Sequence, residues 1–428
     1  MGSDVRDRIF AKCARRLIPF MMLLYAVNYL DRVNIGFAGL TMTRDLGLSP
    51  TAFGLSAGVF FVGYLLFQVP ANLMLERVGP RRGAFLILLT WGGISAATAL
   101  VHGTGGLVLL RILLGMAEAG FFPSMILYLA RWFPQAYRAR NTAAFMTAIP
   151  LSSIIGAPLS GLILKMDGAL GLHGWQWLFF LEGIPACLLA FMVLRFLPNG
   201  PADATWLTEE EKKWIAVRLS ADGPPAPTDP WTAMRDRRVL TLCLVAFGLG
   251  FGGYGVSLWL PQILQSLGYS PATVGLIIAG LSAIGMASMI AWGRSSDARN
   301  ERAWHVALPV ALAAAGLMVL SIVHEGFPAV AALIPVAIGL LATDGPFFSL
   351  PSAFLNGRAA ASGIALINAV GSLGAFAGPP IVGALKERSG DYGAGMIALA
   401  VVLSFSAILV RVLGQAMTAR HSLIGSET

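Results

Sequence analysis

Apolar segments of about 20 residues recur along the whole chain, and each could span a bilayer core roughly 30 Å thick as an α-helix. Hydrophobic residues make up 56% of the 428-residue sequence and charged residues only 12%. The short alternating segments typical of an outer-membrane barrel do not occur. The chain is therefore predicted to be an all-α membrane protein with many spans.

Twelve transmembrane helices are predicted, six on each side of one hydrophilic stretch. The expected spans are residues 17–40, 51–75, 83–101, 105–130, 141–165, 175–197, 238–262, 271–293, 304–323, 328–352, 359–385 and 393–414. The predicted domains are an N-terminal six-helix bundle (1–197), a cytoplasmic linker (198–237) and a C-terminal six-helix bundle (238–428).

The linker is expected to hold one short helix. Thr208 and Glu211 have the spacing of a capping box, in which each side chain bonds the backbone N–H of the other residue. The Gly- and Pro-rich residues 223–227 should end regular structure.

The placement of Lys and Arg orients the spans. If both termini are cytoplasmic, 24 of the 30 basic residues lie at the termini, in cytoplasmic loops or at adjoining helix ends. This excess follows the positive-inside rule, so the pI near 9.7 indicates topology and not nucleic-acid binding. The first apolar run has spanning length and no small-residue cleavage site, so it is expected to remain as the first span.

An internal repeat relates the two halves. Gly156-Ala-Pro-Leu-Ser-Gly161 returns as Gly378-Pro-Pro-Ile-Val-Gly383, at an offset of 222 residues. In the loops after spans two and eight, Glu76 and Asp297 correspond. An arginine follows each of them five positions later, namely Arg81 and Arg302. Two six-helix halves in the same orientation are typical of transporters that expose a midplane site to each side alternately.

The loop after span two reads NLMLERVGPRR (72–82) and contains Glu76, Arg77, Gly79, Arg81 and Arg82. This pattern resembles the signature of the major facilitator superfamily. More narrowly, YLDRVNIGFA (29–38), RILLGMAEAGFFPSMI (111–126), WQWLFFLEGIPA (175–186) and ASGIALINAVGSLGAFAGPPIVG (361–383) resemble the anion:cation symporter family, above all the tartrate- and phthalate-type carriers of bacteria. The resemblance covers nearly the whole chain. It implies the major facilitator fold and a carrier in the bacterial inner membrane. The loop residues expected to gate the conformational change are Glu76, Arg77, Gly79, Arg81, Arg82, Asp297 and Arg302.

Five ionisable residues are predicted to lie deep in the membrane: Asp31, Arg32, Arg111, Glu118 and Asp344. A charge at the centre of a span costs roughly 2.5–3.5 kcal/mol on insertion scales. Each of these five residues is therefore predicted to have a functional role. Neighbours on a helix diverge by about 100°, so Asp31 and Arg32 should point in different directions.

Asp31, Glu118 and Arg111 are the expected proton-coupling residues. Asp31 should meet Arg111 in one state of the carrier and lose it in another, which would switch its proton affinity. A permanent ion pair that locks two helices together is the structural alternative. Glu118 lies two turns from Arg111 and is expected to have no base beside it, so it should take a proton more readily.

Arg32 is the expected anchor of a substrate carboxylate, because its guanidinium is expected to be unpaired at mid-depth and so able to present two parallel N–H donors. Tyr25, Asn28 and Arg32 form one polar stripe on the first span. Asp344 should face the same cavity and be protonated or paired when substrate is bound. The expected substrate-binding residues, several of them implied by the family resemblance, are Arg32, Tyr29, Tyr64, Asn368, Phe348 and Asp344.

Enzymatic chemistry is not predicted. The three cysteines have no paired spacing, and neither a metal nor another cofactor is expected. The hydrolase-like Gly54-Leu-Ser-Ala-Gly58 lies inside a predicted span with no strand before it. The expected function is proton-coupled import of a small organic acid anion such as tartrate, a sugar acid or an aromatic carboxylate. The alternative is a proton-driven antiporter on the same fold. The expected partners are the anion, protons and the lipid bilayer, with no nucleic acid, and the carrier is expected to be a monomer.

Overall fold

A computed structural model describes residues 3–220, 234–323, 325–351, 354–355 and 357–425, and within these ranges helices dominate and no strand occurs. The helices of the first half are α1 (Ser3–Asp45), α2 (Pro50–Gly58), α3 (Phe60–Val78), α4 (Pro80–Thr98), α5 (Thr104–Glu118), α6 (Phe121–Trp132), α7 (Gln135–Met146), α8 (Ala148–Ile163) and α9 (Gly174–Phe196). The later helices are α10 (Glu209–Ser220), α12 (Arg237–Ser266), α13 (Pro271–Arg299), α14 (Ala303–Leu320), α15 (Gly326–Ser349), α16 (Gly357–Ser389) and α17 (Gly393–Gly425).

Each of the twelve predicted spans overlaps one or two helices of the described chain. Ten helical segments of the described residues are long and apolar enough to cross a membrane. The other two predicted spans, 17–40 and 83–101, fall on α1 and α4. Polar residues in the middle of α1 lower its hydropathy, and α4 is only 19 residues long and begins with Pro-Arg-Arg. The all-helical, many-span prediction is confirmed.

Proline residues break two of the predicted spans into pairs of helices. Pro150 has no N–H to donate to the carbonyl of Met146, where α7 ends. Pro123 likewise cannot donate to Ala119, which follows the end of α5. The missing hydrogen bonds explain why spans 105–130 and 141–165 each contain a break.

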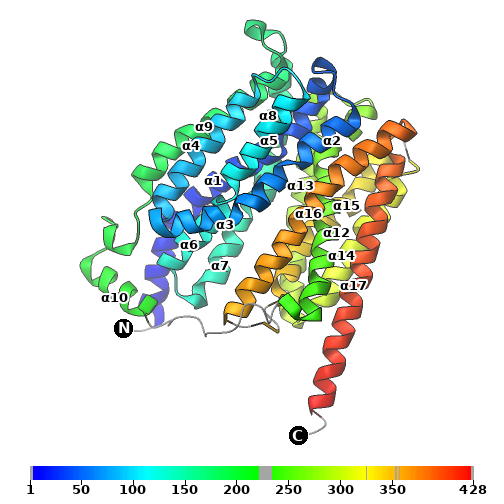
Figure 1. Ribbon diagram of the computed structural model, residues 1–428. Helices are drawn as coiled ribbons and strands as arrows, with labels where there is room; N and C mark the ends of the chain where they lie inside the picture. Colours follow the sequence, from blue (N-terminus) through cyan, green and yellow to red (C-terminus); the bar gives the residue numbers. More distant parts are fainter. Residues whose placement is uncertain (1–2, 221–233, 324, 352–353, 356, 426–428) are drawn as a thin grey trace. The chain divides into compact units, whose positions relative to one another are not determined.

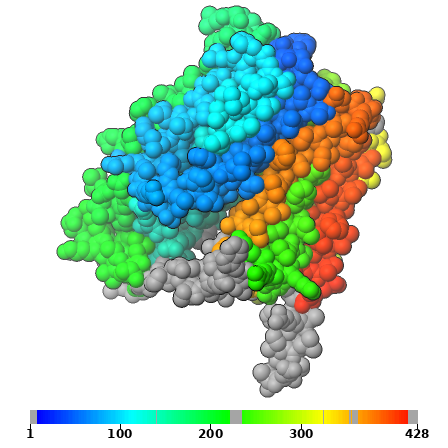
Figure 2. Space-filling view, viewed as in Figure 1, coloured from blue at the N-terminus to red at the C-terminus, as the bar shows by residue number. Residues whose placement is uncertain are grey.

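The chain forms two compact units. The first comprises residues 1–34, 63–153 and 166–224, and the second comprises 35–62, 154–165 and 225–428. Within the first unit α4 lies along α9, and within the second α12 lies along α16 and α14 along α15 and α17 (Figure 1). Figure 2 shows α16 packed directly against α17. The expected boundaries at 197 and 238 stay a prediction.

Glycines allow close helix contacts inside the second unit. Gly54 of α2 meets the backbone carbonyl of Pro379 on α16, and Gly275 of α13 meets that of Ala157 on α8. A Cβ atom at either glycine would clash with backbone. Ala157 and Pro379 belong to the two copies of the repeated Gly/Pro motif. Both copies therefore lie at close contacts between helices.

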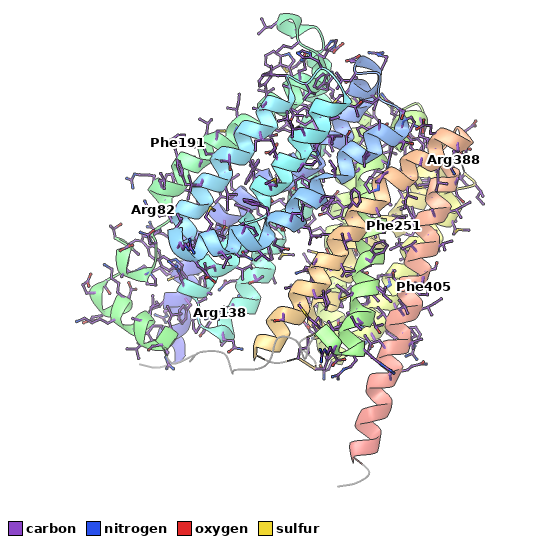
Figure 3. The ribbon with its side chains drawn as sticks, viewed as in Figure 1. Arg82, Arg138, Phe191, Phe251, Arg388 and Phe405 are labelled. Atoms are coloured by element: carbon purple, nitrogen blue, oxygen red, sulfur yellow. The ribbon has the colours of Figure 1, made fainter. Side chains whose placement is uncertain are left out.

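Large apolar side chains on the outer faces of the helices are exposed. Phe191 on α9 is 59% exposed and Phe405 on α17 is 55% exposed (Figure 3). In contrast, Phe251 on α12 is 4% exposed. Apolar faces of this kind are suited to contact with lipid.

Residues 198–220 of the linker belong to the first unit and pack on it. The predicted capping box is confirmed, since the Thr208 N–H donates to Glu211 Oε2 over 2.9 Å and the Glu211 N–H donates to Thr208 Oγ1 over 3.2 Å. Lys12 of α1 donates to Glu211 Oε2 over 2.9 Å. Trp206 stacks on Trp132 with ring centroids 5.5 Å apart. The expected end of regular structure at 223–227 lies outside the described residues.

Candidate functional site

Arg32 and Glu118 form an ion pair in the interior of the first unit. Arg32 Nη2 lies 3.0 Å from Glu118 Oε2, and Arg32 Nε lies 3.3 Å from the same oxygen. Asn28 Nδ2 donates to that oxygen over 2.9 Å. Glu118 Oε1, in contrast, has no hydrogen-bond partner within the described part of the chain. The Glu118 side chain is fully buried and that of Arg32 is 11% exposed, so Arg32 is the accessible member of the pair.

Asp31 points away from Arg32, into the contact between α1 and α4. Ser95 Oγ donates to Asp31 Oδ1 over 2.6 Å, and Trp91 Nε1 donates to Asp31 Oδ2. Asn34 Nδ2 donates to Asp31 Oδ1 over 3.2 Å. Asp31, Trp91 and Ser95 are completely buried. The cost of burying this carboxylate is therefore offset by three hydrogen-bond donors.

Close helix packing holds these donors in place. Trp91 and Ser95 are four residues apart and so share one face of α4. On the same helix Gly92 packs so tightly on α9 that an added Cβ would lie 2.8 Å from the Gly183 carbonyl oxygen. This close approach of α4 to α9 constrains where the donors to Asp31 lie.

Arg111 lies two turns before Glu118 on α5 and is 1% exposed. Its guanidinium interacts electrostatically with the charges of Glu118, Asp31 and Arg32. The predicted pairing of Asp31 with Arg111 in one state, and its loss in another, stays a prediction.

Aromatic side chains adjoin the Arg32–Glu118 pair. The ring of Tyr64 lies 5.3 Å from the Arg32 guanidinium carbon. Tyr25 stacks on Phe145 with centroids 4.6 Å apart, and Phe122 lies 5.9 Å from Tyr25 and 6.2 Å from Phe145. Tyr25 is one turn from Asn28, and Phe122 is four residues beyond Glu118. We call Tyr25, Tyr64, Phe122 and Phe145 the aromatic cluster.

Two sequence expectations about this site are wrong. The sequence predicts that Glu118 has no base beside it and that the Arg32 guanidinium is unpaired. The structure shows instead that Arg32 on α1 and Glu118 on α5 form an ion pair with each other. A sequence shows which residues share a helix face but not the register between two helices. The predicted divergence of Asp31 from Arg32 agrees with their separate partners.

Three predicted substrate-binding residues lie in the second unit. Asp344 is half-buried on α15, and the described residues provide it with no hydrogen-bond or ion-pair partner. Phe348 is 46% exposed, and Asn368 is half-buried on α16. In the first unit, Tyr29 is half-buried on α1 beside Asn28. Whether these residues line one cavity with Arg32 stays a prediction.

The signature loop is almost entirely helical. Only Gly79, with φ of +84°, separates α3 from α4, a conformation that favours glycine. Glu76, Arg77 and Arg82 are exposed, and Arg81 donates to the Leu194 carbonyl of α9.

In the corresponding loop of the second half, Arg302 Nη2 lies 2.7 Å from Asp297 Oδ1. The equivalent acid and base are thus paired in this loop. The proposed gating role of both loops stays a prediction.

Sequence reasoning missed Trp91, Ser95 and Asn34 as partners of Asp31. A signal was present, because Trp91 and Ser95 are hydrogen-bonding residues on one face of a predicted span. Among the described residues, no group of three or more His, Cys, Asp or Glu side chains is placed to hold a metal ion.

The sequence was compared with models of known protein families. The family model for the Major Facilitator Superfamily matches residues 21–379. The chain belongs to the Major Facilitator Superfamily. This family consists of carriers, so the protein is a multi-pass membrane carrier and not an enzyme.

Relatives of this superfamily member carry names of different substrates. The chain is 45% identical over 416 residues to a protein of Agrobacterium vitis whose name assigns it to tartrate transport, covering 96% of this chain and 93% of that protein. It is also 40% identical over 411 residues to a quinolone resistance transporter of Acinetobacter baumannii, covering 95% of each.

Solved structures with the same fold include a bacterial homologue of the human lysosomal transporter Spinster, in an inward-facing and occupied conformation. It has a TM-score of 0.76 at 17% identity, over 93% of this chain and 96% of that one. A D-xylose–proton symporter has a TM-score of 0.72 at 17% identity, over 92% of this chain and 96% of that one. At this identity the likeness establishes the fold of the major facilitator carriers.

Proposed function

We propose that this carrier imports a small organic acid anion together with protons across the bacterial inner membrane, with both termini in the cytoplasm. The observation that carries the proposal is the Arg32–Glu118 pair, in which one partly accessible guanidinium is held by one enclosed carboxylate. The charge distribution supports the orientation, since 24 of 30 basic residues then lie at cytoplasmic positions.

A substrate carboxylate competes with Glu118 for Arg32. Glu118 occupies both Nε and Nη2 of the guanidinium, which form the side-on pair of donors that a carboxylate uses. A substrate that takes these donors leaves the Glu118 carboxylate buried without its closest counter-charge. A buried carboxylate in that position is strongly disfavoured in its ionised form.

Proton uptake by Glu118 relieves this conflict. Glu118 Oε1 is buried and lacks a hydrogen-bond partner among the described residues, so a proton can bind there without displacing Asn28 from Oε2. Anion binding to Arg32 and protonation of Glu118 thus favour each other. On release of the anion, Arg32 pairs with Glu118 again and the proton leaves. Asp31, adjacent to Arg32 in sequence, is the second proposed proton-coupling acid, and Arg111 interacts with both acids.

A proton-driven antiporter that exports its substrate is the second candidate. The specific observation in its favour is the 40% identity to the quinolone resistance transporter. The same Arg32–Glu118 competition would serve this direction only if substrate and proton bound in alternation.

Proteoliposomes with an imposed pH gradient distinguish the two directions. Purified protein is reconstituted, and uptake of tartrate, gluconate and benzoate is measured with either the lumen or the bath more acidic. Symport concentrates substrate in the alkaline compartment, and antiport concentrates it in the acidic one. Protein-free liposomes correct for passive diffusion of benzoic acid. Substrate accumulation that does not depend on the pH gradient would contradict proton coupling in either direction.

A further inference from the structure

We propose that the substrate is an aromatic monocarboxylate, with its single carboxylate on Arg32 and its ring against the aromatic cluster. This inference rests on the proposed function, because it assumes that Arg32 binds the substrate carboxylate. It narrows the class of anion and sets tartrate-like dicarboxylates apart as poor substrates.

The charges of the first unit match one negative charge on the substrate. Among the described membrane-spanning residues, the basic side chains away from the helix ends are Arg32 and Arg111. Arg111 is 1% exposed, whereas Arg32 is 11% exposed on its side chain. A single guanidinium is therefore the accessible cation, and it can take one carboxylate in bidentate geometry.

A second carboxylate on the substrate would meet unfavourable charges. Glu118, which bonds Arg32, and Asp31, its neighbour in sequence, are both acidic and both buried. The other basic group that interacts with them, Arg111, is 1% exposed. A dianion would bring its second charge into this low-dielectric region without an accessible counter-charge.

The body of the substrate would contact aromatic rings. Tyr64 lies over the Arg32 guanidinium at 5.3 Å, so a ring attached to the bound carboxylate starts beside an aromatic face. Phe122 is half-buried, lies four residues beyond Glu118, and packs on Tyr25 and Phe145. Offset-stacked and edge-to-face ring contacts contribute beyond simple burial. A polyhydroxylated chain such as tartrate would bury its hydroxyl groups against these rings.

Isothermal titration of the purified full-length carrier with matched ligands tests both parts of the proposal. 4-Nitrobenzoate and terephthalate have nearly the same shape but one and two negative charges. Benzoate and cyclohexanecarboxylate have the same charge but differ in aromaticity. Tartrate is the fifth ligand. We expect the affinity for 4-nitrobenzoate to be at least about tenfold higher than that for terephthalate. We expect the affinity for benzoate to be about fivefold higher than that for cyclohexanecarboxylate.

Two variants link these preferences to the site. Tyr64→Leu should reduce the preference for benzoate over cyclohexanecarboxylate to within about twofold, while Phe191→Leu on the outer face of α9 should leave it unchanged. Arg32→Lys should lower the affinity for every one of the five ligands.

The outcomes separate this inference from the proposed function. Tighter binding of tartrate or terephthalate, still dependent on Arg32, overturns the monoanion class but leaves the proposed function standing. Equal affinities for benzoate and cyclohexanecarboxylate overturn the aromatic part. If none of the five ligands binds in an Arg32-dependent manner, the proposed function itself fails.

Discussion

Arg32 Nη2 and Glu118 Oε2 lie 3.0 Å apart, although the two residues are 86 positions apart in the chain. The pair joins α1 to α5 inside the first unit and brings together the proposed carboxylate anchor and a proposed proton carrier. Under the proposed function, substrate and proton would act on this one contact, which would provide a direct physical route for coupling.

Arg32→Lys should weaken substrate binding by about tenfold or more, because lysine keeps the charge but loses the two parallel donors. The measurement is isothermal titration with the tightest ligand of the carboxylate panel. Arg411→Lys provides a matched control, since Arg411 also lies over an aromatic ring, 4.3 Å from Trp304. Equal affinity of the wild type and Arg32→Lys would exclude Arg32 as the anchor.

Trp91→Phe should destabilise the carrier and impair proton-driven accumulation, because it removes a donor to the buried Asp31 carboxylate. Hydrogen bonds to charged groups contribute roughly 1.5–3 kcal/mol. Thermal unfolding in detergent measures the loss of stability. Trp177→Phe is the control, since Trp177 donates to a neutral backbone carbonyl, that of Ala169. A smaller loss for Trp91→Phe than for Trp177→Phe would contradict the role assigned to Trp91.

Asp344→Asn should retain substrate binding within about threefold, since the sequence predicts that Asp344 is protonated or paired when the anion is bound, and asparagine mimics the neutral form. Titration of the purified variant with the same ligand checks this. Abolished binding would show that the ionised carboxylate of Asp344 is itself required.

Glu211→Gln should loosen α10 from the first unit at pH 7. Burial raises the pKa of Glu211, but hydrogen bonds from Lys12 and Thr208 lower it, and the net pKa lies below the usual range. A carboxyl group with a depressed folded pKa contributes stability above its unfolded pKa of about 4.3 and loses it as the pH falls through the folded value. The glutamine variant at pH 7 therefore mimics the wild type at a pH below both values.

Amide hydrogen exchange over residues 209–220 measures this effect at constant pH. Exchange should be faster in Glu211→Gln than in the wild type. The neighbouring Glu210 is exposed, so Glu210→Gln should exchange like the wild type. Identical exchange in both variants would mean that the Lys12 contact does not hold α10.

Much of the fold was predictable because each span has to satisfy the same bilayer constraint. Apolar runs of spanning length and basic residues at one side are local properties of a sequence. The breaks at Pro123 and Pro150 were also within reach, since a proline cannot donate the helix hydrogen bond. The capping box at Thr208 and Glu211 was predicted from spacing alone and is confirmed.

The partners within the candidate site were less predictable. The stripe of Tyr25, Asn28 and Arg32 follows from helix periodicity, but Glu118 as the partner of Arg32 depends on the register between α1 and α5. The donors to Asp31 depend likewise on the tight contact at Gly92, which fixes the position of α4. Side-chain partners across helices follow from packing, which the pattern of a single helix does not contain.

The central claim is that Glu118 carries the proton that drives accumulation. In Glu118→Gln, Arg32 loses its carboxylate partner and the site loses its titratable group, but the carboxylate anchor remains. Proteoliposomes containing this variant should exchange labelled for unlabelled substrate at equal pH on both sides, yet fail to concentrate substrate when a pH gradient is imposed. Accumulation against the substrate gradient at the wild-type level by Glu118→Gln would contradict the account.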